Sequence, residues 1–176
     1  NRGYADSHIP EAVFVDSNWI RKPKAPPTFL PTPEEFEALM SRLGIAHNTK
    51  VVAYDERGGI YAARLWWILN YYGHSNVALL DGGLQSWQKA GLPMTTEQPA
   101  IHPRHFDGRP RADLVVGTDA IAAGTAGLLL DARTGKRFRG EAEPIDPVAG
   151  HIPGAVNLPL QKNLLLLTCN NRQHQI

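Results

Sequence analysis

The sequence is poor in cysteine, in basic runs and in uninterrupted apolar stretches. One cysteine, Cys169, among 176 residues excludes an internal disulfide framework. It is consistent with a reducing compartment, so we expect a cytoplasmic location. No apolar stretch approaches the roughly 20 residues that a membrane-spanning helix needs. No basic run dominates a formal net charge of +1, so we expect neither a nucleic-acid partner nor a membrane.

An internal repeat is the strongest signal that is present. Residues 7–13, Ser-His-Ile-Pro-Glu-Ala-Val, return at residues 150–156 as Gly-His-Ile-Pro-Gly-Ala-Val. Each residue of the second copy lies 143 positions after its counterpart in the first. A repeat at domain-sized spacing indicates one fold laid down twice. We therefore expect most of one domain followed by the opening portion of a second.

Strand patterns and helix patterns alternate along the chain. This alternation predicts an α/β fold, a parallel sheet with helices on both faces. The chain is expected to start in a loop, and residues 132–150 to form a polar loop. The predicted strands are 12–15, 50–54, 76–80 and 128–131, and the predicted helices are 33–43, 60–72, 84–90 and 118–123.

The first of these helices has clear boundary signals. Thr32 is placed as the N-cap, Pro33 occupies the first helical position, and Glu35 completes a capping box. Apolar residues follow at helical spacing, and Gly44 can end the helix.

Proline content divides the chain into three parts. We predict a domain at 1–91, a linker at 92–117 with four prolines, and the N-terminal portion of a second domain at 118–176. In the second copy, the strand that starts at Leu128 precedes the repeated heptapeptide. Its first-copy equivalent would lie ahead of Asn1, so we expect the first domain to lack that strand.

Five motifs in order resemble the rhodanese family, specifically its tandem two-domain thiosulfate and 3-mercaptopyruvate sulfurtransferases. The resemblance implies the rhodanese-like fold, with an incomplete second domain. The motifs are the repeated His-Ile-Pro-x-Ala-Val, Val-Val-Ala-Tyr-Asp (51–55) with Ala-Ala-Arg-Leu-Trp-Trp (62–67), Leu-Asp-Gly-Gly-Leu-Gln-Ser-Trp (80–87), Leu-Asp-Ala-Arg (130–133) with Arg-Phe-Arg-Gly (137–140), and the segment 150–159.

The family resemblance implies a chemistry. In such proteins a loop cysteine takes a sulfur atom from thiosulfate or 3-mercaptopyruvate, holds it as a persulfide, and passes it to cyanide or another thiophilic acceptor. Backbone N–H groups of the loop and the following helix stabilise the thiolate. The implied partner is a small anionic sulfur donor, and no metal or organic cofactor is implied.

The first domain carries Asp55 where the family's loop cysteine would stand. A carboxylate cannot accept sulfane sulfur as a persulfide, so this domain resembles the noncatalytic half. The alternative is a phosphatase-like nucleophile, but the second aspartate that such sites place two residues on is absent. The simpler interpretation is a loop aspartate held by neighbouring backbone N–H groups.

Cys169 is the only cysteine available to the second domain, and its spacing is unsuitable. Asp55 follows Pro10 by 45 residues, whereas Cys169 follows Pro153 by 16. We therefore assign no catalytic residue and expect this polypeptide to be inactive. It would then be a noncatalytic interaction or regulatory module. Residues 161–176 do not resemble the family, which suggests an altered reading frame, an artefact or a truncation.

Arg133 and Arg137 match family arginines that bind the anionic sulfur donor. A planar guanidinium meets sulfonate or carboxylate oxygens in a bidentate manner. The alternative for both is solvation at the surface, or pairing with Asp131, Glu141 or Glu143.

The histidines and tryptophans are interpreted as structural. His8 and His151 occupy the duplicated position, and one of them lies in the noncatalytic half, so a shared structural role is simpler. His102 and His105 have no partner at ligand spacing, and we expect no metal site. The three tryptophans at 66, 67 and 87 are expected in the core or at a domain interface.

Two further expectations concern the donor and self-association. Enzymes of the mercaptopyruvate type often place an acidic residue and a histidine where this sequence has Asn18 and Thr28, which favours thiosulfate over 3-mercaptopyruvate. An exposed strand at Leu128–Asp131 predicts self-association by strand donation between chains.

Overall fold

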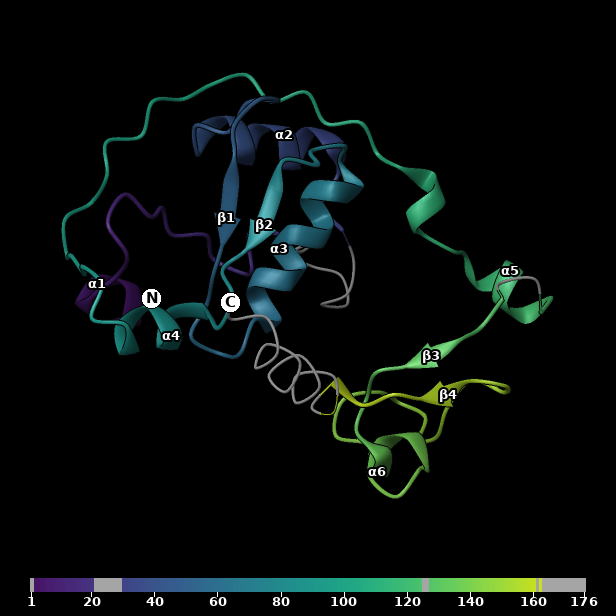
Figure 1. Ribbon diagram of the computed structural model, residues 1–176. Helices are drawn as coiled ribbons and strands as arrows, with labels where there is room; N and C mark the ends of the chain where they lie inside the picture. The colour runs from purple at the N-terminus through teal and green to yellow at the C-terminus, as the bar shows by residue number, and fades with distance from the viewer. Residues whose placement is uncertain (1, 21–29, 125–126, 161, 163–176) are drawn as a thin grey trace, which may run out of the picture. The chain divides into compact units, whose positions relative to one another are not determined.

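The computed structural model describes residues 2–20, 30–124, 127–160 and 162. The chain divides into two compact units, residues 1–115 and 116–176. None of the described helices is long and apolar enough to cross a membrane. Unit 1 contains α1 (Arg2–Asp6), α2 (Pro33–Arg42), β1 (Val51–Ala53), α3 (Ile60–Tyr71), β2 (Val77–Leu79), α4 (Gly83–Lys89) and the short 3₁₀ helix η1 (Ala112–Leu114), and unit 2 contains α5 (Thr118–Ala122), β3 (Leu130–Asp131), α6 (Gly135–Phe138) and β4 (Val156–Asn157) (Figure 1).

Helix α2 begins and ends where the sequence predicts. The Thr32 hydroxyl accepts a hydrogen bond from the Glu35 N–H, and the Glu35 carboxylate accepts one from the Thr32 N–H at 2.7 Å. At the other end, Gly44 adopts a φ of 78°, and the N–H of Ile45 reaches back to the Met40 carbonyl at 3.0 Å. The predicted capping box and glycine stop are thus confirmed.

Strands β1 and β2 pair in parallel, with Val51 opposite Val77, and α3 forms the connection between them. Helix α3 contacts both strands. The Phe36 ring of α2 stacks on the ring of Tyr72, just after α3, with centroids 4.4 Å apart. The core of unit 1 comprises Ile20, Phe36, Leu39, Met40, Ile45, Ile68, Leu69, Tyr72 and Phe106.

The stretch predicted as a linker is attached to unit 1 by its backbone. The N–H of Arg104 donates to the Ser41 carbonyl at 2.9 Å, and the N–H of Arg109 donates to the Tyr72 carbonyl at 3.0 Å. Between them, the Phe106 side chain is buried against Phe36 at a centroid distance of 5.7 Å. Residues 92–115 therefore supply part of the core despite their lack of periodicity.

His74, which follows α3, is buried beside Phe106. Neither ring nitrogen has a partner within hydrogen-bonding limits among the described residues. Burial lowers the pKa of His74 below its usual range, although the nearby backbone of Thr49 and Asn76 favours the charged form, and the charge of His47 lowers the pKa further. His74 is therefore a buried, neutral ring in the folded state at neutral pH.

Two sequence-based predictions for the start of the chain are wrong. Residues 2–6 form α1 instead of a loop, and residues 12–15 form no strand. Glu11 adopts a φ of 63°, which turns the backbone just before the expected strand. The equivalent strand in unit 2, β4, pairs with β3, whereas none of the described segments pairs with residues 12–15.

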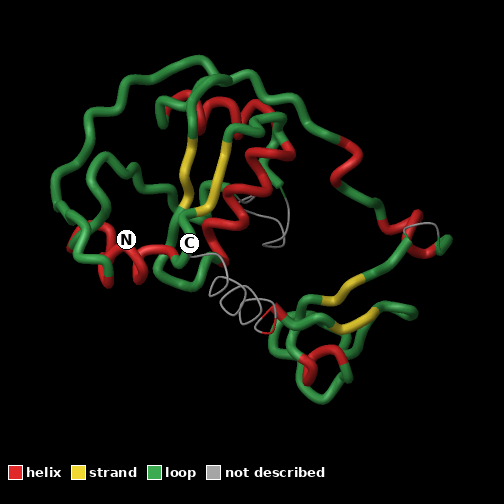
Figure 2. The backbone as a smooth tube through the Cα atoms, in the orientation of Figure 1, coloured by secondary structure: helices red, strands yellow, loops and turns green. Residues whose placement is uncertain are grey.

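In unit 2, β3 and β4 pair in parallel, with Leu130 opposite Val156. The parallel pairs and intervening helices of the two units confirm the α/β class. Loops make up most of the described part of unit 2 (Figure 2). One expected loop contains α6, which starts because Thr134 caps it by accepting a hydrogen bond from the Arg137 N–H. The prediction of a continuous polar loop over 132–150 is therefore wrong.

Candidate functional site

Asp55 lies in the loop between β1 and α3, inside a ring of backbone N–H groups. One carboxylate oxygen accepts hydrogen bonds from the N–H groups of Arg57 and Gly59, both at 2.8 Å. The other accepts from Tyr61 at 2.8 Å and Ala62 at 2.9 Å, in the first turn of α3. The Asp55 side chain thus accepts hydrogen bonds from four backbone N–H groups at the N-terminus of α3 that have no acceptor within the helix. We call this ring of four N–H groups the cradle.

These four bonds determine the charge of Asp55. Burial by itself would raise the pKa of this carboxyl group, but the N–H groups of Ala62, Gly59, Arg57 and Tyr61 outweigh it and hold the pKa below its usual range. The loop aspartate is therefore ionised, and its own carboxylate fills the cradle.

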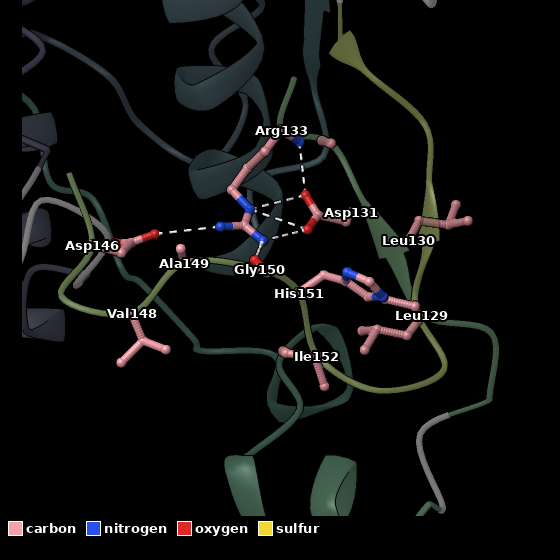
Figure 3. A pocket seen from close by; sticks show the side chains of 12 residues that line it. Leu129, Leu130, Asp131, Arg133, Asp146, Val148, Ala149, Gly150, His151 and Ile152 are labelled. Carbon is pink, nitrogen blue, oxygen red and sulfur yellow. Dashed lines mark hydrogen bonds and ion pairs between the residues drawn. The ribbon is translucent and has the colours of Figure 1, made fainter. Parts of the chain in front are cut away.

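Arg133 follows β3 and makes hydrogen bonds on several sides (Figure 3). Its Nη2 donates to Asp131 Oδ2 at 2.7 Å and to the Gly150 carbonyl at 2.6 Å. Its Nη1 donates to Glu143 Oε2 at 3.2 Å. The bonds and charge of Arg133 lower the pKa of Asp131, and Asp131 raises that of Arg133. Arg133 ties the end of β3 to the segment that begins the second repeat.

Arg137 lies in α6 and shares its acidic partners with Arg133. Its Nη2 donates to Glu143 Oε1 and to Asp146 Oδ2, both at 2.8 Å. Hydrogen bonds from Arg137, together with the backbone N–H groups of Asp146 and Ile145, lower the pKa of Glu143 to about 2. The structure therefore brings the two predicted arginines together around one buried carboxylate.

A hollow of about 510 Å³ opens beside Arg133 (Figure 3). Apolar side chains of Leu129, Val148 and Ile152 form much of its wall, and Arg133, Asp131 and Asp146 supply the charged part. An apolar cavity with a few polar groups at one side is the usual form of a small-ligand site. Arg133 is the group at this wall that could bind a small anion, and the carboxylates of Asp131 and Asp146 are its present partners.

The duplicated histidines make the same two contacts in the two units, although His8 is buried and His151 is exposed. The His8 ring stacks on Tyr4 with centroids 3.9 Å apart, and its Nδ1 lies 2.8 Å from the Tyr4 carbonyl oxygen. The His151 ring stacks on Phe138 at 3.7 Å, and its Nδ1 lies 2.7 Å from the Phe138 carbonyl oxygen. Each histidine fastens the repeated segment to a short helix, which supports the predicted structural role.

The other singled-out residues do not join this site. His102 and His105 lie on the exposed stretch after α4, and no cluster of metal-ligating side chains occurs among the described residues. Asn18 donates its backbone N–H to Asp16. Thr28 and Cys169 lie outside the described residues.

One of the three predicted tryptophan environments, that of Trp66, differs from a buried core. Trp66 is exposed, whereas Trp67 is partly buried and stacks on Tyr71 with centroids 5.5 Å apart. The Trp87 ring N–H donates to the Pro93 carbonyl. Trp66 therefore belongs to the surface of unit 1.

Sequence reasoning missed one acidic member of the site, Asp146. Of the predicted acidic partners, Glu143 pairs with both arginines. Glu141 pairs with Arg139 instead. Asp146 stands nine residues after Arg137 in an irregular segment. No periodic pattern links the two positions, so only the excess of acidic residues after α6 indicated a partner.

Comparisons with known proteins agree with the motifs. Residues 1–90 match the rhodanese-like domain. A Pseudomonas aeruginosa protein named probable 3-mercaptopyruvate sulfurtransferase is 44% identical over 172 residues, which cover 93% of this chain and 61% of that protein. The Bos taurus thiosulfate sulfurtransferase is 32% identical over 170 residues, which cover 92% of this chain and 57% of that protein.

A solved structure shows the same relationship. The 3-mercaptopyruvate sulfurtransferase from Leishmania major is 31% identical and superimposes with a TM-score of 0.75, over 90% of this chain and 46% of that one. This chain thus spans about three fifths of the length of the two sequence relatives. The rhodanese-like domain matches more than half of the residues of this chain, so the chain belongs to the rhodanese family.

Proposed function

We propose that this protein functions in rhodanese-type sulfur transfer, with thiosulfate as the sulfur donor. The observation that carries the proposal is the pair of guanidinium groups, Arg133 and Arg137, held together by Glu143, with Arg133 lining an open hollow. Fixed arginines are suited to binding the oxygen atoms of a small anion. The three relatives reported above are all named sulfurtransferases, and their names supply the reaction class.

In the proposed reaction, to which this chain contributes donor binding, a cysteine thiolate other than that of Cys169 attacks the outer sulfur of thiosulfate. The S–S bond of the donor breaks, sulfite leaves with the electron pair, and the outer sulfur remains on the enzyme as a persulfide. A nucleophilic acceptor such as cyanide then takes that sulfur and releases the thiolate. The arginines hold the sulfonate end of the donor and stabilise the charge that sulfite carries away.

Unit 1 has no part in carrying sulfur under this proposal. The Asp55 carboxylate occupies the four-donor cradle, where a thiolate would otherwise be stabilised. We further propose that Cys169 is not the sulfur carrier, because it follows Pro153 by only 16 residues. This polypeptide by itself is then inactive in turnover and retains only the donor site. We also propose a cytoplasmic location, because the low cysteine content of the chain is consistent with a reducing compartment.

Two measurements test the proposal. Isothermal titration calorimetry should show that thiosulfate binds the chain and that Arg137→Ala weakens this binding; absence of thiosulfate binding would contradict the donor site. Thiocyanate production from thiosulfate and cyanide should not exceed that of a Cys169→Ser control. Turnover that is lost in Cys169→Ser would show that the spacing argument is wrong.

The filled cradle also favours a second candidate, a rhodanese-like module that binds a partner without turnover. The third candidate, a 3-mercaptopyruvate sulfurtransferase, is supported by the name of the Pseudomonas relative. Titration with 3-mercaptopyruvate under the same conditions separates these possibilities. Tighter binding of 3-mercaptopyruvate than of thiosulfate would favour the third, and binding of neither donor would favour the second.

A further inference from the structure

One carboxylate oxygen is shared by the two arginines of the proposed donor site. Asp146 Oδ2 lies 2.8 Å from Arg137 Nη2 and 3.6 Å from Arg133 Nη1. The guanidinium groups come from different segments, one after β3 and one in α6, and both are directed at this oxygen. An oxygen atom of an external anion bound by both arginines would have to occupy the same place.

The two carboxylates that contact both arginines differ in how firmly they are held. Glu143 has a side chain only 5% exposed, and it also accepts hydrogen bonds from the backbone N–H groups of Ile145 and Asp146. The Asp146 side chain is 50% exposed, and its observed contacts in the described structure are those with the arginines. Glu143 is therefore a fixed part of the site, whereas Asp146 lies at the side open to solvent.

Both arginines would keep other partners if the Asp146 side chain moved away. Arg133 remains bound to Asp131 and to the Gly150 carbonyl, and both arginines remain bound to Glu143. Movement of Asp146 would therefore free one N–H of Arg137 and remove the charge that faces Arg133, without releasing either side chain. The remaining contacts keep both groups oriented toward the vacated place.

We propose that Asp146 is a resident counter-ion that the incoming anion displaces, and that Glu143 is the positioning residue that keeps the arginine pair in place during the exchange. This inference rests on the proposed donor site. It makes Asp146 a determinant of specificity, because a ligand must compete with a carboxylate that is already present. A dianion such as thiosulfate competes better than a singly charged carboxylate, since each arginine meets a larger negative charge.

Three substitutions that each remove one negative charge from the same segment test the proposal. Asp146→Asn removes the counter-ion, Glu143→Gln removes the fixed carboxylate, and Glu141→Gln is the matched control because Glu141 pairs with the exposed Arg139 instead. Thiosulfate binding is measured by isothermal titration calorimetry at low salt. If net charge alone governed binding, all three variants would bind thiosulfate more tightly, and by similar factors.

We expect the change in thiosulfate affinity to differ in sign among the three variants. Asp146→Asn should bind thiosulfate about two- to fivefold more tightly, the equivalent of one exposed ion pair. Glu143→Gln should bind at least about tenfold more weakly despite its lower negative charge, because a buried partner of both arginines is lost. Glu141→Gln should stay within about twofold of the unchanged protein.

A second variant keeps the test valid if Glu143→Gln fails to fold. Glu143→Asp retains the charge but draws the carboxylate back from the arginines, so weaker binding at unchanged net charge would support positioning. Tightening in all three neutralised variants, or no tightening in Asp146→Asn, would overturn the inference while leaving the donor site intact. Failure of the unchanged protein to bind thiosulfate would instead contradict the proposed function itself.

Discussion

The cradle around Asp55 predicts a large loss of stability in Asp55→Ala. Four backbone N–H groups lose their acceptor, and two of them, those of Gly59 and Ala62, belong to part-buried hydrogen bonds. Water can replace the carboxylate at the two exposed donors. At about 1.5 kcal/mol for each part-buried bond to a charged acceptor, the free energy of unfolding of unit 1 should fall by about 3 kcal/mol.

Urea denaturation followed by tryptophan fluorescence measures this loss in unit 1. All four tryptophans lie within residues 1–115, so the signal does not report on unit 2. A loss of about 3 kcal/mol should lower the urea midpoint by roughly 1–3 M. The matched control is Asp107→Ala, which removes an exposed pair with Arg109 and should cost less than about 1 kcal/mol.

The dependence on pH provides a second readout for the same position. The pKa of Asp55 is lower in the folded state than its ordinary value of 3.8, so its stabilising effect is complete above that pH and is lost as the pH falls through the folded pKa. The stability difference between the unchanged protein and Asp55→Asn should therefore shrink only below about pH 4. A cost for Asp55→Ala no larger than that of Asp107→Ala would refute the cradle argument.

Further predictions concern the same cradle, a buried histidine and the exposed strand of unit 2. In a Cys169→Ser background, Asp55→Cys should have a thiol pKa below about 7.5, as thiols at helix N-termini do; alkylation rates measured against pH check this, and an ordinary value near 8.5 would contradict it. The pKa of His74 is lowered in the folded state, so stability should fall as the pH drops through its ordinary value of 6.5. In His74→Leu that pH dependence should be reduced, as urea midpoints at pH 5.5 and 8 would show, whereas an equal dependence in both proteins would exclude His74 as its source. We also propose that the chain self-associates through β3, where Leu130 is half exposed. Sedimentation should show a mass that rises with concentration and a reversal in Leu130→Lys; a strict monomer at high concentration would contradict this.

Local signals in the sequence predicted most of the regular elements. The capping box at Thr32 and the glycine at 44 act within a few residues of the helix that they bound, so they can be recognised without knowledge of the fold. The alternation of strands with helices likewise predicted the parallel pairing of β1 with β2, because a helical connection returns the chain in the same direction.

The elements that were wrongly predicted depend on distant partners. The segment 12–15 has strand-forming residues, but a strand needs a neighbour, and none of the described segments pairs with it. Phe106 lies in a stretch without periodicity, and its burial depends on the rings of Phe36 and His74. The pairing of Asp146 with two arginines depends on the path of an irregular segment. None of these is encoded by residue spacing.

The attachment of residues 92–115 to unit 1 means that the boundary of the sequence family and the boundary of the folded unit differ. A protein cut at residue 90, where the family match ends, would lose Phe106 and leave an empty space beside Phe36. Removal of a buried phenylalanine side chain costs about 3–5 kcal/mol, a large part of a domain's stability. A separately expressed first unit should therefore extend to about Val115, and a shorter one is expected to unfold more readily.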